Sequence, residues 1–505
     1  MGRSRGSTNA WCRFLFLVVS GFLVSLFWPA LTPTSAQQTV APQSSDSSNN
    51  PIPEVRTMPG VGSLPSSTFD PSSLIRQNLP GAARTSAAPA QLSLTDAINL
   101  ALQNNLSTLS AQEQRRAATG FTQQARSALL PNISGVTYQA NITTNLAALG
   151  FQPGTFPGFN TSFIGPFNNF DARARLVQNI FDLSAIRNYQ SSRQGVRIAE
   201  FRQQLAREQV AEATALTYLE TLRSERNVSA AQANVTQAEA LLRLAQDQRN
   251  AGVATGTDVT RAETRLAQER TDFYQAQTTA EQARLNLQRV IGVPLGSPLV
   301  LTDQLAFTAE PLPEINTAVA DAMVHRAEVL ISEAQVSMFK LERKAVRDEY
   351  LPSLQFLGDY GVSGITPTNT DLPTRRVAVQ LNVPIFNGGL TQGRLSVASS
   401  RAREAELQLG SVRGQVEQDV RLAISTLRTS VERVRAADEA VTLAERELQM
   451  SQDRFRAGVA DNLEVINAQT SLANARASQV QALAVYNAAR LNLAAALGRA
   501  ETFRW

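Results

Sequence analysis

The stretch Ala251-Gly252-Val253-Ala254 recurs 206 residues later as Ala457-Gly458-Val459-Ala460. A second stretch, Ala283-Arg284-Leu285-Asn286-Leu287, recurs at the same offset as Ala489-Arg490-Leu491-Asn492-Leu493. Two matches at one offset indicate an internal duplication, which has to be recognised before single elements are assigned. We therefore divide the chain into a first repeat over 91–291, a linker over 292–314, a second repeat over 315–498 and a tail over 499–505.

Each repeat is expected to hold a helix, two strands, a very long helix, a turn and a last helix. The expected helices cover 94–129, 186–250 and 258–291, then 315–351, 390–456 and 461–497. The expected strands cover about 132–145 and 170–181, then 353–362 and 375–386, with an insertion in the Gly- and Pro-rich loop 149–169 of the first repeat. The two longest helices lack proline, and at 1.5 Å per residue each would measure roughly 100 Å. The fold class is α+β, mostly α, with an α-β-β-α-α pattern that occurs twice.

Two rows of residues run along the long helices at a spacing of seven. In the second repeat the large row is Val420, Leu427, Val434, Val441, Leu448 and Phe455, and the small row is Ser430, Ala437, Ala444 and Ser451. The first repeat has both rows, in Val228, Val235 and Leu242 and in Ser224, Ala231, Ala238 and Ala245. A period of 3.5 residues predicts left-handed supercoiling. Because small residues let helices approach closely, the pattern favours a curved wall of helices over a two-stranded coiled coil.

Apolar and polar residues alternate along all four expected strands. Such strands fit a half-buried sheet in a soluble domain, and they also fit the lipid-facing strands of outer-membrane proteins. An open four-stranded sheet would leave backbone groups unpaired in lipid. In a membrane, several chains would therefore have to close one barrel.

The N-terminus has the pattern of an exported protein. Arginines at positions 3, 5 and 13, an apolar run over 14–28 and small residues up to Ala36 predict a signal peptide over 1–36. Residues 37–90 are rich in Ser and Pro and are expected to form a disordered leader. Cleavage would remove Cys12, the one cysteine, which suits an oxidising periplasm.

Composition excludes several classes of function. Lys plus Arg is 47 against 43 for Asp plus Glu, without a dense basic run, so we expect no nucleic-acid partner. One His and one Cys remove most metal sites and most nucleophile–base pairs. We expect no enzyme, no catalytic residue, no metal and no cofactor, and we assign His325 to a helix surface.

The sequence resembles the TolC family of outer-membrane efflux proteins over nearly all of 91–497. The resemblance includes the repeat order and the junctions, namely Leu130-Pro131, Leu351-Pro352, Gln178-Asn179-Ile180-Phe181-Asp182 and Val383-Pro384-Ile385-Phe386-Asn387-Gly388-Gly389. It implies a homotrimer with a 12-stranded β-barrel in outer-membrane lipid, continuous with a long periplasmic α-helical barrel. A periplasmic adaptor (membrane fusion protein) and an inner-membrane RND or ABC transporter would complete an efflux or type I secretion system.

Two alternatives stay open from sequence. The cargo can be a drug, a lipid, a siderophore or a protein, because a polar lumen does not distinguish them. The whole chain can also be a periplasmic coiled-coil scaffold without a pore. Strands at matching places in both repeats argue against the scaffold, which needs none.

The resemblance also assigns sites at the turns that follow the long helices. Asp258, Glu464 and Asn467 would face the lumen and form the pore constriction at the periplasmic tip. The adaptor would dock on Gly252, Val253, Gly458 and Val459. Helix capping explains the acidic residues equally well, and turn geometry explains the glycines. Phe455 and Ala460 replace a tyrosine and an arginine of the family's gating network, so we expect a less firmly closed tip.

Overall fold

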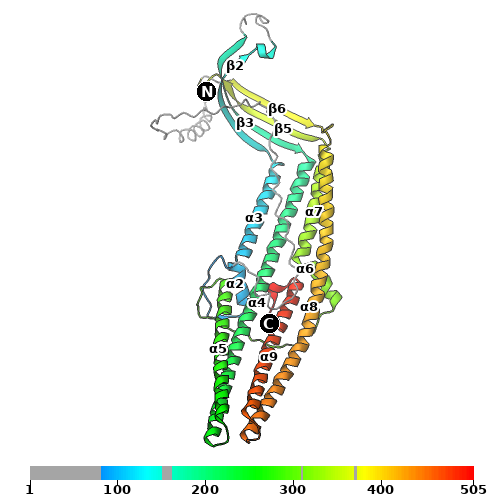
Figure 1. The fold of residues 1–505 in the computed structure, drawn as a ribbon. Coiled ribbons are helices and arrows are strands. Elements are labelled where there is room, and N and C mark those ends of the chain that lie inside the picture. Colours follow the sequence, from blue (N-terminus) through cyan, green and yellow to red (C-terminus); the bar gives the residue numbers. More distant parts are fainter. Residues whose placement is uncertain (1–80, 151–161, 309–310, 369–371, 505) are drawn as a thin grey trace, which may run out of the picture. The chain divides into compact units, whose positions relative to one another are not determined.

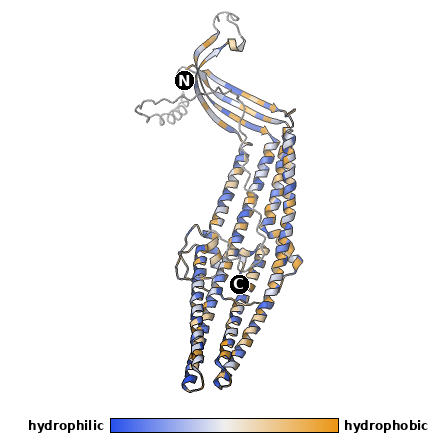
Figure 2. Ribbon diagram, in the orientation of Figure 1, coloured by the Kyte–Doolittle hydropathy of each residue, from blue (hydrophilic) through white to orange (hydrophobic). Residues whose placement is uncertain are grey.

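The computed structural model describes residues 81–150, 162–308, 311–368 and 372–504. The expected signal peptide, the leader up to residue 80 and the middle of the loop 149–169 lie outside the described residues, and they stay predictions. Among the described helices, none combines the length and the apolar character needed to cross a membrane. Consistent with this, no helix in Figure 2 is hydrophobic throughout.

The α-β-β-α-α pattern is confirmed in both repeats (Figure 1). In the first repeat it runs through α2 (Leu94–Asn104), α3 (Leu106–Ser127), β2 (Asn132–Asn145), β3 (Phe163–Phe181), α4 (Leu183–Asn250) and α5 (Gly256–Ile291). The second repeat follows with α6 (Ile315–His325), α7 (Ala327–Asp348), β5 (Ser353–Gly364), β6 (Leu372–Asn382), α8 (Leu390–Arg456) and α9 (Asn462–Ala496). Short elements complete the described chain: β1 (Gln91–Leu92), η2 (Ala147–Leu149), β4 (Val300–Leu301) and η3 (Ala500–Thr502).

The first helix of each repeat was expected to be continuous, and both are divided. Asn105 has an extended backbone and ends α2, and its side chain accepts a hydrogen bond from the Ser107 amide to cap α3. Arg326 takes the same place between α6 and α7. In the strands, β3 begins seven residues earlier than expected, and β6 ends at Asn382 instead of reaching 386.

The four long strands form one antiparallel sheet in the order β2-β3-β5-β6. Two hairpins, one from each repeat, join where β3 pairs with β5. The outer edges of β2 and β6 have no neighbour among the described residues. Each hairpin continues into a long helix, and Asp182 caps α4 by accepting a hydrogen bond from the Ala185 amide at 2.9 Å.

Three of the strands share an apolar face. The register brings Leu176, Gly358 and Val377 to one side, together with Ala174, Tyr360, Phe356 and Val379 of the same three strands. The first strand differs, because its apolar residues Val136 and Tyr138 pair with Arg173 and Asp171 on the opposite side. Alternation reveals which residues of a strand share a side, but pairing decides which side that is.

The two rows along the long helices are buried or nearly so. The small row of α8 is buried throughout, and of the large row only Val441 is partly accessible. Helix α8 packs against α9 and α7, while α4 packs against α5, α7 and α3. These contacts confirm that the rows are packing surfaces within one chain.

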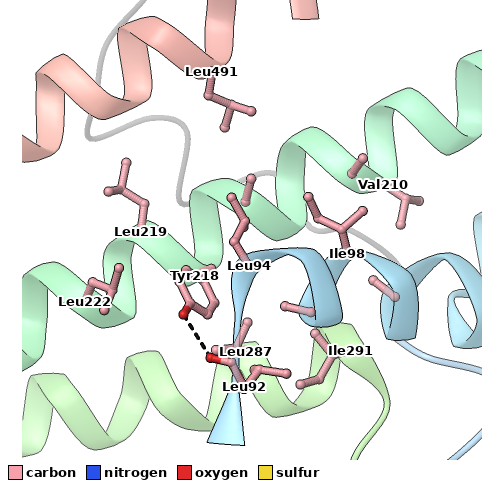
Figure 3. Packing of buried hydrophobic residues seen from close by; sticks show 14 of the residues in the cluster. Leu92, Leu94, Ile98, Val210, Tyr218, Leu219, Leu222, Leu287, Ile291 and Leu491 are labelled. Carbon is pink, nitrogen blue, oxygen red and sulfur yellow. Dashed lines mark hydrogen bonds between the residues drawn. The ribbon is translucent and has the colours of Figure 1, made fainter. Parts of the chain in front are cut away.

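The largest hydrophobic cluster lies where α2, α4 and the end of α5 meet (Figure 3). Tyr218 is fully buried there, and its hydroxyl donates a hydrogen bond to the Leu92 carbonyl at 3.0 Å. Leu92 belongs to β1, which pairs in parallel with β4. The sequence assigned β4 to a linker, because two residues are too few for a detectable alternation.

Residues 81–90, which the sequence placed in the disordered leader, are bonded to the first repeat. The Ala82 amide donates to the Arg289 carbonyl at 3.1 Å, and the Ser86 amide donates to the Gly292 carbonyl at 2.8 Å. Gly292 has a φ of +76°, and an added Cβ would lie 2.6 Å from the Ala82 Cβ. This segment is therefore packed, in contrast to the expectation.

Candidate functional site at the helix turns

The turn after each long helix is built by a glycine in the left-handed conformation. Gly252 has a φ of +75°, and the next amide, of Val253, donates to the Gln248 carbonyl at 2.9 Å. In the second repeat Gly458 has a φ of +69°, and the Val459 amide donates to the Arg454 carbonyl at 3.0 Å. Both are Schellman turns, in which a residue with a Cβ at the glycine position would be strained.

The apolar residue after each glycine points into solvent. Val253 is 65% exposed and Val459 is 71% exposed. The Schellman bond uses only their backbone amides, so the turn does not require a large apolar side chain. Two exposed valines at equivalent turns are therefore free to contact a partner.

Asp258 has its carboxylate engaged in a capping box. It accepts hydrogen bonds from the Thr255 amide at 2.9 Å and from the Thr255 hydroxyl at 2.6 Å, at the first turn of α5. These bonds, with the nearby Arg261 guanidinium, hold the pKa of the Asp258 carboxyl below its ordinary value. Asp258 is thus ionised over the whole physiological pH range.

Glu464, at the equivalent position of α9, is arranged differently. Its amide donates to the N-cap residue Asp461, but its carboxylate lies 3.3 Å from the Arg454 Nε and 3.5 Å from the Ser451 hydroxyl. The second capping box is therefore incomplete, and the carboxylate is paired with the end of α8. Asn467 lies one turn further along α9 and is exposed.

The two turns are bound to each other within one chain. The buried Asn462 donates from its side-chain amide to the Asp258 carbonyl at 2.9 Å, and Gln248 donates to the Phe455 carbonyl at 3.0 Å. Beneath them, Phe455 packs in a cluster with residues of all four helices, among them Leu241, Val259, Leu448 and Val465.

Asn462 and Gln248 were not predicted from the sequence as residues of this site. The repeat offered a signal, since the residues 206 positions away from them are Gly256 and Arg454, which break the match. A polar residue that departs from its repeat partner at a junction is a candidate for a contact between the repeats.

No group of His, Cys, Asp or Glu suited to a metal ion occurs among the described residues.

The fold and the paired turns define a duplicated helical protein with strand hairpins, of the kind found in bacterial outer-membrane channels. Similar solved structures include the outer-membrane protein VceC of Vibrio cholerae, with a TM-score of 0.69 and 18% identity over 80% of this chain and 96% of that one. The Campylobacter jejuni CmeC outer membrane channel has a TM-score of 0.68 and 17% identity over 81% and 86%.

The model of the outer membrane efflux protein family matches residues 97–293 and 318–499, so the chain belongs to this family. Its relatives include the alkaline protease secretion protein AprF of Pseudomonas aeruginosa, 25% identical over 76% of this chain and 80% of that protein. TolC of Escherichia coli is 25% identical over 66% and 70%. The chain is accordingly an outer-membrane channel protein with a periplasmic helical part, and not an enzyme.

Proposed function

We propose that this channel is a passive homotrimeric duct, in which each chain contributes β2, β3, β5 and β6 to one 12-stranded barrel in outer-membrane lipid. The observation that carries the proposal is that the outer edges of β2 and β6 have no neighbouring strand in the part of the chain that the structure describes. Unpaired backbone groups are too costly in hydrocarbon, so the edges need partners. A β6 edge that pairs with the β2 edge of the next chain supplies them and leaves no free edge after three chains.

The helical part would continue the duct through the periplasm to the turns after α4 and α8. Val253 and Val459, with Gly252 and Gly458, would dock a periplasmic adaptor that recruits an inner-membrane transporter of the RND or ABC class. Their exposure supports this role, because most of the surface of both valines is accessible to a partner.

The constriction would be formed at the same turns by Asp258, Glu464 and Asn467. The hydrogen bonds of Asn462 and Gln248 hold the two turns of one chain together, which supports a closed resting state. Phe455 is buried and therefore stabilises this state through packing. An adaptor that separates the turns would open the duct.

Cell fractionation and gel electrophoresis test the proposal against the scaffold alternative. We expect the mature protein in the outer-membrane fraction, as a species of three chains that dissociates on boiling. Recovery of a dimer or monomer from the soluble periplasmic fraction would support the scaffold instead.

A further inference from the structure

All but one of the charged residues of the four long strands are gathered on one side of the sheet. These strands contain Asp171, Arg173, Arg175, Asp359, Arg375 and Arg376. Arg175 pairs in register with Asp359, which pairs with Arg376, and Asp171 and Arg173 lie on the same side of β3 as Arg175. Arg375 alone pairs with Tyr360 and lies on the apolar side.

Three of the five residues on the charged side form one ion-paired unit. Both carboxylate oxygens of Asp171 accept hydrogen bonds from Arg173, and the Ser363 hydroxyl donates to Asp171 at 2.9 Å. Arg173 also reaches Asp359 across the strand pair, with 3.2 Å between its Nη1 and the Asp359 Oδ1. The residue opposite Arg173 is Gly361, where an added Cβ would lie only 2.5 Å from the Arg173 Cβ. The glycine thus leaves room for Arg173 beside Asp359.

Arg175 and Arg376 are the two charged residues on this side of the sheet that lie outside the ion-paired unit. Both side chains are exposed, and within the described part of the chain neither makes an ion pair or a side-chain hydrogen bond. Asp359 lies between them in register, but it is bonded to Arg173. Three guanidiniums therefore face two carboxylates, which gives this side a net charge of +1 per chain, and the guanidiniums outside the ion-paired unit are those of Arg175 and Arg376.

We propose that Arg175 and Arg376 form a cationic band in the strand-lined section of the duct, which attracts anions and anionic cargo groups. This inference rests on the proposed function, which places one side of the sheet in lipid. The apolar side with Leu176, Val377 and Val379 carries one arginine, Arg375, whereas the charged side carries three, and a lipid-facing arginine is costly in a barrel. The charged side consequently faces the lumen, where three chains contribute six unpaired guanidiniums. Rings of fixed charge concentrate the opposite ion in a pore.

The neighbouring Arg375 offers a matched control, because it has the same charge one residue away on the opposite side of β6. Purified full-length mature protein is inserted into planar lipid bilayers, and the reversal potential in a KCl gradient gives the permeability ratio of potassium to chloride. We expect the double variant, Arg175→Gln with Arg376→Gln, to raise the permeability ratio of potassium to chloride by about two- to threefold. Arg375→Gln and the charge-preserving pair Arg175→Lys with Arg376→Lys should leave it unchanged.

An unchanged ratio in the double glutamine variant would overturn the inference, as would an equal shift in Arg375→Gln or in the lysine pair. Should the double variant form no pores, each single variant is measured, and both should shift the ratio in the same direction. Loss of pores in both single variants would assign the two arginines to assembly and would also overturn the inference. If the wild-type protein forms no pores, the proposed duct is refuted and not only the cationic band. The experiment therefore distinguishes failure of the proposed function from failure of this inference.

Discussion

The side-chain amide of Asn462, at the start of α9, donates a hydrogen bond to the backbone carbonyl of Asp258, at the start of α5, over 2.9 Å. The contact joins the two repeats at the turns where the family relationship places the periplasmic tip. Asn462 is fully buried, so water does not compete for this bond. We therefore regard it as one of the contacts that hold the tip of each chain closed.

Replacement of Asn462 by alanine should loosen the tip. A neutral hydrogen bond contributes about 0.5 to 1.5 kcal/mol, so the open population should rise roughly two- to tenfold per chain. Single-channel conductance and mean open time in bilayers measure the change. The matched control is Asn250→Ala, which makes the same substitution at an exposed position, the end of α4, without breaking a bond between the turns. Equal conductance of both variants would refute the role of Asn462.

Replacement of both Asp258 and Glu464 by alanine should weaken the preference for cations. Three chains would place these carboxylates around the narrowest section, where they concentrate cations. If both residues serve only as helix caps, the double variant loses about 0.5 to 2 kcal/mol of stability with unchanged selectivity. A reversal-potential measurement on the folded variant separates these outcomes.

The Asp258 carboxylate should make the folding stability of the protein depend on pH. The pKa of Asp258 is lowered in the folded state, so its contribution to stability is fully present above the ordinary value of about 3.9 and is lost as the pH falls through the lowered pKa. We expect the difference in melting temperature between wild type and Asp258→Asn to be constant from pH 5 to 8 and to shrink below pH 4. A difference that instead disappears between pH 5 and 8 would contradict the assignment.

The small row of α8 should not tolerate larger residues. Ala437 and Ala444 are 9% and 6% exposed, and overpacking costs about 1 to 3 kcal/mol per site. The pair Ala437→Leu with Ala444→Leu should therefore lower the melting temperature. The control is Ala436→Leu with Ala440→Leu on the same helix, where both alanines are exposed in the chain. Equal stability of the two pairs would refute close packing along the row.

We expect that residues 37–80 of the leader can be deleted, whereas residues 81–90, which pack against the first repeat, cannot. Deletion of 37–80 from the mature chain should preserve trimer formation and export, because its composition provides no core residues. Deletion of 37–90 should destabilise the first repeat, since it removes the contacts of Ala82 and Ser86 with the end of α5. Thermal unfolding and export assays of the two deletions compare these expectations directly.

The order of the elements could be predicted from the sequence because the duplication gives every element two independent appearances. The long helices were predictable from their heptad rows, and α8 begins at Leu390 and ends at Arg456, as predicted. The breaks at Asn105 and Arg326 were not, because a single capping residue interrupts a helix without changing its apolar pattern. The side to which β2 turns Val136 and Tyr138 depends on pairing with β3, which alternation along one strand does not encode.

The candidate site was predicted only in its turn residues. Gly252 and Gly458 have a strong local signal, because few residues other than glycine adopt their backbone conformation. The partners of Glu464 depend on how the end of α8 packs against the start of α9. From the sequence, helix capping was therefore one of two open roles for its carboxylate, and the ion pair with Arg454 in the structure was not predicted. The bonds of Asn462 and Gln248 connect residues more than 200 positions apart, beyond the reach of local patterns.

Whether this chain forms a passive duct is tested most directly by the current through a planar lipid bilayer after addition of the purified full-length mature protein. We expect stepwise increases in current of equal size without any energy source, produced by the trimeric species and abolished when that species is boiled beforehand. A folded protein that produces no current at any voltage, under conditions where a known outer-membrane pore inserts, would show that the chain does not form a duct.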